Sequence, residues 1–118
     1  MAPVAGFHSM TLSICTAQLN FVVGDLPGNV RKIVDAARQA HAAGARLLLT
    51  PELALCGYAA EDLFLRPAFL SACDDAVKTV ARELAGLKGL HVVVGHPTGG
   101  DIRSKSVAVQ RRWPWRPA

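Results

Sequence analysis

The sequence lacks the marks of a disulfide-rich or metal-binding protein. Its three cysteines, Cys15, Cys56 and Cys73, are odd in number and none has CxxC spacing. This excludes a disulfide framework or a zinc site and favours small buried thiols in a reducing compartment. The four histidines also lack ligand spacing, so we predict no metal site.

Long apolar runs and phosphate-binding loops are also missing. No run approaches the length of about 20 residues that a membrane span needs. The first ten residues have neither the charged start nor the long apolar stretch of a secretory signal. We therefore expect a cytoplasmic location and no membrane partner. Neither GxGxxG nor GxxxxGKS/T occurs, so we predict no cofactor in this chain.

The composition is that of one globular domain, with 118 residues, 51% hydrophobic and 19% charged. The net charge of +4 arises at the end of the chain. Residues 1–100 hold eight basic and eight acidic side chains, whereas residues 101–118 hold five basic and one acidic. The surplus of positive charge lies in the tail and not in the folded part of the chain, so we do not expect nucleic-acid binding.

Apolar periodicity predicts a β-α-β-α-β order and an α/β fold. Strands are expected at residues 11–19, 47–50 and 91–95, and helices around residues 30–41 and 69–87. The second and third strands are continuous apolar runs, as in strands buried on both faces. Strands joined by helices usually run parallel.

Turn-forming and polar residues set the expected limits of these elements. Asn29 could cap the first helix, and Gly44 fits its left-handed end. A fourth strand could lie at residues 106–110. We predict a domain over residues 11–110 and an irregular basic tail over residues 111–118, where the loss of pattern suggests a change of reading frame.

Glu52 is the candidate catalytic residue. It directly follows the second predicted strand, in the segment TPELALCGY. That position is the carboxyl edge of the sheet, where ligands of open α/β folds bind. Partial burial would disfavour the charged carboxylate and suit it to general-base catalysis. A glutamate that only caps a turn or makes a surface ion pair fits the spacing as well.

Five short segments occur in order between residues 17 and 97. They are AQLNFVVGD (17–25), GN (28–29), PELALCGY (51–58), EDLFLRP (61–67) and VVVGHP (92–97). Together they resemble the start of the nitrilase superfamily, closest to the glutaminase domain of bacterial glutamine-dependent NAD synthetases. The pairing of PELALCGY with EDLFLRP is more specific than a general nitrilase pattern. Ala59 and Ala60 replace the family's usual prolines, which removes no reactive group.

The resemblance implies a four-layer α/β/β/α sandwich, of which this chain would supply part of one sheet and two helices. It also implies a glutamate, a lysine and a cysteine as catalytic groups. Glu52 matches the glutamate, the general base that takes the thiol proton before the thiolate attacks the amide carbon. The resemblance also implies that Tyr58 belongs to the loop that lines the family's glutamine pocket. For Tyr58, substrate contact and simple packing are both open.

The family's lysine and nucleophilic cysteine belong to motifs beyond the matched segments, so we expect this truncated stretch to be inactive alone. Cys56 stands inside the glutamate motif and Lys105 precedes the lysine motif. We therefore exclude Cys56 as the nucleophile and Lys105 as the catalytic lysine. For a full-length enzyme, the resemblance implies glutamine as substrate, amidation of deamido-NAD to NAD, and a homo-oligomer. ATP and Mg²⁺ would bind a separate synthetase domain.

Two other functions remain open. One is an amidase of the same superfamily that has no synthetase partner. The other is a non-catalytic binding module whose basic tail contacts nucleic acid or protein, which would make binding steeply salt-dependent.

Overall fold

The computed structural model describes residues 11–57, 63, 65–98 and 103–109, with the backbone alone for residue 98 and the last range. The elements, in chain order, are β1 (Ile14–Thr16), α1 (Leu26–Ala42), β2 (Leu47–Leu49), α2 (Pro67–Leu84), β3 (His91–Thr98) and β4 (Arg103–Val109). The described strands form one sheet in the order β1-β2-β3-β4, in which the first three are parallel. The predicted α/β class and β-α-β-α-β order are confirmed, and β4 adds an antiparallel partner to β3.

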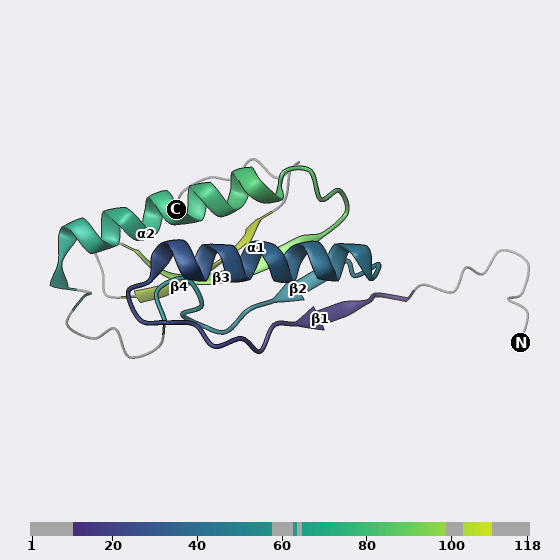
Figure 1. The fold of residues 1–118 in the computed structure, drawn as a ribbon, viewed down its shortest axis with the longest axis horizontal. Helices are drawn as coiled ribbons and strands as arrows, with labels where there is room; N and C mark the ends of the chain where they lie inside the picture. The colour runs from purple at the N-terminus through teal and green to yellow at the C-terminus, as the bar shows by residue number, and fades with distance from the viewer. Residues whose placement is uncertain (1–10, 58–62, 64, 99–102, 110–118) are drawn as a thin grey trace, which may run out of the picture.

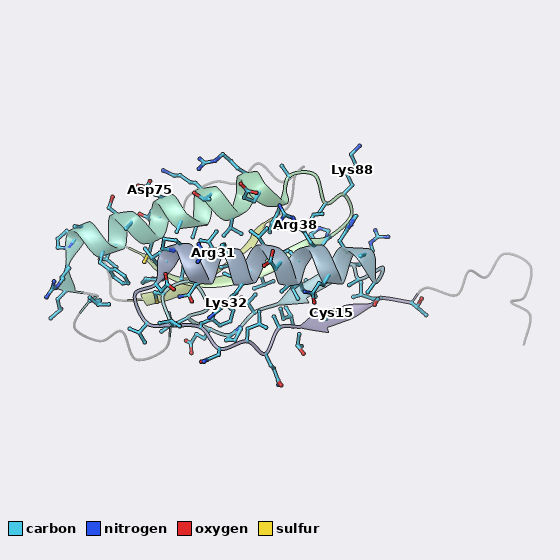
Figure 2. The ribbon with its side chains drawn as sticks, in the orientation of Figure 1. Cys15, Arg31, Lys32, Arg38, Asp75 and Lys88 are labelled. Atoms are coloured by element: carbon cyan, nitrogen blue, oxygen red, sulfur yellow. The ribbon has the colours of Figure 1, made fainter. Side chains whose placement is uncertain are left out.

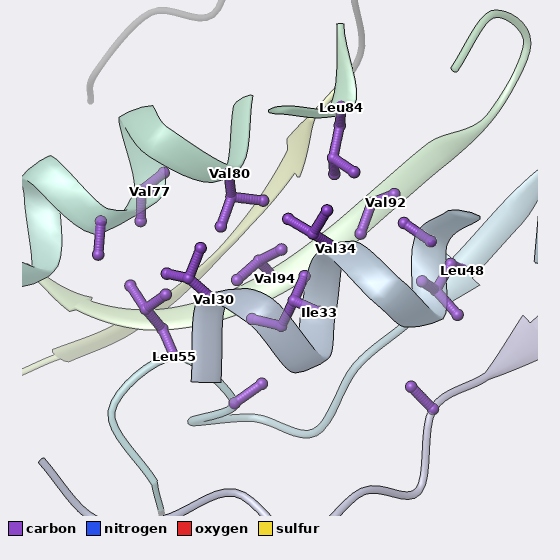
Figure 3. Close-up of a cluster of buried hydrophobic side chains, with 14 of the residues drawn as sticks. Val30, Ile33, Val34, Leu48, Leu55, Val77, Val80, Leu84, Val92 and Val94 are labelled. Atoms are coloured by element: carbon purple, nitrogen blue, oxygen red, sulfur yellow. The ribbon is translucent and has the colours of Figure 1, made fainter. Parts of the chain in front are cut away.

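Both helices lie on one face of the sheet (Figure 1). Their apolar stripes face the strands and each other, which is why residues at three- and four-residue spacing form the core (Figure 3). The largest fully buried apolar side chains are Ile33, Leu48, Leu55, Val77, Val80, Val92 and Val94. Charged side chains such as Arg31, Arg38 and Asp75 are exposed on the helices (Figure 2). In the described part of the chain, neither helix could cross a bilayer.

On the opposite face of the sheet, side chains of β1 and β2 are exposed among the described residues. Leu48 and Val92 pair across β2 and β3 and are 2% and 1% exposed, on the side of the helices. Leu49 is 36% exposed and Ile14 is 50% exposed, because side chains alternate between the two faces of a strand. The prediction that the second strand is buried on both faces is therefore wrong among the described residues. The run is apolar on both faces, but only its helix-side face is covered.

The start of α1 also differs from the prediction. Asp25 is the N-cap, and its side chain accepts a hydrogen bond from the Gly28 N–H at 3.1 Å. Asn29 lies inside the first turn of the helix and is fully buried, so it is not the cap. Gly44 follows the helix with φ +83°, which confirms the predicted left-handed end. The predicted tail, residues 111–118, lies outside the described residues.

Candidate active site

Glu52 lies in a turn, residues 51–57, that follows the carboxyl end of β2. Thr50 joins this end to β3, because its N–H and Oγ1 both donate to the Val93 carbonyl, at 3.2 Å and 2.7 Å. The predicted position of Glu52 just beyond a strand is therefore confirmed. Its side chain is exposed, whereas Leu55 in the same turn is fully buried. The partial burial expected for Glu52 is not supplied by the residues that the structure describes.

Gly95 in β3 lets the Glu52 turn sit directly against the sheet. A Cβ at Gly95 would lie 1.5 Å from the carbonyl oxygen of Glu52 and 2.9 Å from that of Pro51. No side chain fits in that space. The Leu55 N–H also donates to the Gly95 carbonyl at 3.3 Å. The backbone of β3 therefore sets the position of the Glu52 turn from one side.

The loop before α1 holds the turn from another side. The Gly24 N–H donates to the Cys56 carbonyl at 2.9 Å. Gly57 adopts φ +82°, and a Cβ there would lie 2.7 Å from both the N and the Cα of Val23. Glycine at this position therefore permits both the backbone conformation and the close contact between the two segments.

Asn29 links the same two segments through its side-chain amide. Its Oδ1 accepts from the Val22 N–H at 2.9 Å, and its Nδ2 donates to the Val22 carbonyl at 2.8 Å and to the Leu55 carbonyl at 2.9 Å. Segments that are separate in the sequence thus meet around the Glu52 turn. The roles of Asn29 and Gly95 were not predicted from the sequence, although both residues stand in segments that carry the family resemblance.

The buried cysteines are unsuited to nucleophilic attack. Burial raises the pKa of the Cys56 thiol above 9.0, and the thiol lies 3.5 Å from the Gly57 carbonyl, to which it donates. Burial, with added repulsion from Cys56 and Asp74, raises the pKa of Cys73 to about 12. Both groups remain neutral thiols near pH 7, whereas the thiolate is the nucleophile. This supports the exclusion of Cys56 from a catalytic triad.

The remaining predictions concern Tyr58, Lys105 and a metal site. Tyr58 lies outside the described residues, and only the backbone of Lys105 in β4 is described. In the described ranges, no three His, Cys, Asp or Glu side chains could hold a metal ion. A cavity of about 550 Å³ lies between β1 and α1, lined by Cys15, Ala40 and Leu48 among others. Its lining includes no residue of the Glu52 turn, so it is separate from the candidate site.

Several characterised proteins are similar to this chain. A glutamine-dependent NAD(+) synthetase of Synechocystis is 49% identical over 72 residues, which are 61% of this chain and 13% of that protein. The same enzyme of Xanthomonas campestris is 39% identical over 105 residues, 86% of this chain and 18% of that protein. The chain thus corresponds to less than a fifth of these relatives' length.

Solved structures show the same similarity. The glutamine-dependent NAD(+) synthetase of Cytophaga hutchinsonii superposes with a TM-score of 0.72 at 27% identity, covering 84% of this chain and 17% of that one. An amidase from Nesterenkonia gives a TM-score of 0.61 at 27% identity, covering 82% and 36%. A variant of that amidase carries acrylamide added at its active-site cysteine.

The family match covers most of the domain. The model of the carbon-nitrogen hydrolase family matches residues 13–107 and so includes the Glu52 turn, both helices and all described strands but the last two residues of β4. The fold and the ordered segments agree with this match. The chain belongs to the carbon-nitrogen hydrolase family.

Proposed function

We propose that this chain provides the general base, Glu52, of a glutamine-hydrolysing site in a glutamine-dependent NAD synthetase. The observation that carries the proposal is the convergence of the family segments on the turn that holds Glu52. Asn29, Gly57 and Gly95 lie far apart in the sequence, yet each one fixes the backbone of this turn. The similarity to NAD synthetases supplies the substrate class.

The proposed reaction starts with proton transfer to the Glu52 carboxylate from a cysteine thiol that a further segment of the enzyme would supply. The thiolate attacks the amide carbon of glutamine, and a lysine with backbone donors stabilises the oxyanion. Collapse of this intermediate breaks the C–N bond. Ammonia leaves with the proton from Glu52, and water hydrolyses the thioester to glutamate and free thiol. A cysteine at the active site is known in the related Nesterenkonia amidase.

Other features of the proposed enzyme rest on the same similarity. Glutamine is the substrate of the site, and Tyr58 contributes to its pocket. ATP and Mg²⁺ would bind a separate synthetase domain, as the similarity to glutamine-dependent NAD synthetases suggests. A cytoplasmic homo-oligomer is the proposed assembly.

A hybrid enzyme tests the role of Glu52. Residues 13–107 of this chain replace the matching segment of the Synechocystis synthetase, and NAD formation is measured with glutamine and with ammonia. Glu52→Gln should lower the glutamine-dependent rate by about 10²–10⁴-fold, the usual contribution of a general base, and leave the ammonia-dependent rate unchanged. Glu83→Gln, which alters an exposed glutamate near Arg38, is the matched control. Full glutamine-dependent activity in Glu52→Gln contradicts the proposal.

An amidase that acts without a synthetase domain is a second candidate, favoured by the structural similarity to the Nesterenkonia enzyme. It shares the base and the cysteine chemistry but not the coupling to NAD formation. A hybrid that releases ammonia from simple amides and not from glutamine would favour this candidate.

A further inference from the structure

The side-chain amide of Asn29 is buried and hydrogen-bonded within the protein. It is 0% exposed, and its oxygen and its nitrogen together make three hydrogen bonds to backbone groups. A side-chain amide has two N–H donors, and here both have carbonyl partners. Buried polar groups require such partners, so the identity of this side chain is tightly constrained.

The hydrogen bonds of Asn29 act on the Glu52 turn from the side opposite β3. Leu55, three residues after Glu52, has its carbonyl bound by Asn29 Nδ2 at 2.9 Å and its N–H bound to the Gly95 carbonyl at 3.3 Å. The peptide groups of Leu55 are therefore held by α1 on one side and β3 on the other. The Leu55 side chain points into the core between them (Figure 3).

No common substitution preserves this arrangement. Ionised aspartate has the same size but only accepts hydrogen bonds, so the oxygen that replaces Nδ2 would lie against the Val22 and Leu55 carbonyls. Alanine removes all three bonds. Glutamine retains the amide but adds a methylene in a site with no exposed surface.

We propose that Asn29 is a positioning residue for Glu52, and that its buried amide fixes the turn from which the base acts. Its consequence for catalysis rests on the proposed glutaminase function. Asn29 touches no reacting group, because its partners are all backbone atoms of this chain. Its effect is transmitted through the Leu55 peptide to the turn.

Amide hydrogen exchange on the 118-residue chain tests the structural part. In Asn29→Ala, the exchange rates of the Val22, Gly24 and Leu55 amides should rise above their wild-type values. This rise should be on the order of tenfold larger than the rise for the core amides of β3. Val80→Ala is the control, because it weakens the core without removing a hydrogen bond to the turn. Equal relative changes in the two variants would overturn the inference.

The hybrid enzyme tests the catalytic part with Asn29→Asp and Asn29→Ala. Misplacement of the base predicts a fall in glutamine-dependent kcat of about 10–100-fold with KM changed less than about twofold. The ammonia-dependent rate should stay unchanged, whereas a purely structural role lowers both rates together. Unchanged kcat overturns the positioning role and leaves the role of Glu52 intact. Full activity in Glu52→Gln instead removes the proposed function, and the exchange result still decides whether Asn29 fixes the turn.

Discussion

At the scale of single residues, Gly95 is the position where one methyl group should have the largest effect on the candidate site. Gly95→Ala would bring a Cβ to 1.5 Å from the Glu52 carbonyl oxygen, and the backbone on both sides would have to move. We expect a loss of about 3 kcal/mol in the free energy of unfolding, at the upper end for overpacked sites. Chemical denaturation measures this loss.

Gly86→Ala is the control for that experiment. A Cβ at Gly86 meets no atom within 4 Å. We therefore expect this variant to be neutral or more stable by up to about 1 kcal/mol, because alanine restricts the unfolded chain. Similar stability in the two variants would show that the Glu52 turn does not rest on Gly95 in solution.

Cys73 should make the free energy of unfolding decrease at alkaline pH. Its folded pKa of about 12 lies above the ordinary value of 9.0, so the native state holds the proton more tightly than the unfolded chain. This contribution to the free energy of unfolding is complete below pH 9 and is lost as the pH rises toward 12. Cys73→Ala removes it. Between about pH 8 and about pH 11, wild type should lose more stability than Cys73→Ala. Parallel losses would contradict this.

At the scale of secondary-structure elements, β2 has one covered face and one open face. Leu48 is 2% exposed on the helix side, and Leu49 is 36% exposed on the other side. Leu48→Ala should cost about 2–5 kcal/mol in the free energy of unfolding, because it leaves a cavity in the core. Leu49→Ala should cost less than about half as much in the isolated chain. Equal costs, measured by denaturation at low protein concentration, would show that the second face is covered.

The sequence predicted the helices and strands better than the burial of their faces and the capping of α1. Periodicity found both helices and the parallel strands, because the apolar stripes of α1 and α2 face the sheet. It could not show which face of β2 is covered, since Leu47, Leu48 and Leu49 are all apolar. It also assigned Asn29 to a cap, because a turn-rich segment suits that role. The real cap is Asp25, which frees Asn29 for its buried contacts.

The candidate site was predicted in part. The position of Glu52 after a strand followed from the pattern alone, whereas its role as a base came from the resemblance and remains a prediction. The contacts of Asn29 and Gly95 with the turn could not be predicted, because they join segments separated by more than 20 residues. Such contacts depend on how α1 and β3 pack against the turn.

At the scale of the whole molecule, the described residues form two layers, a sheet with both helices on one face (Figure 1). The four-layer sandwich implied by the resemblance has a second sheet, which would cover the open face near Ile14 and Leu49. A covered face would also change the surroundings of Glu52, which is exposed in this chain. The two-layer unit thus holds Glu52, the proposed base, at the carboxyl end of β2, and the proposed catalytic site requires segments outside this unit.

The ratio of glutamine-dependent to ammonia-dependent NAD formation in the hybrid enzyme tests this account most directly. If Glu52 is the base, Glu52→Gln lowers this ratio by about 10²–10⁴-fold, while Glu83→Gln leaves it at the value of the unmodified hybrid. The same ratio in all three proteins would contradict the assignment of Glu52 as the base.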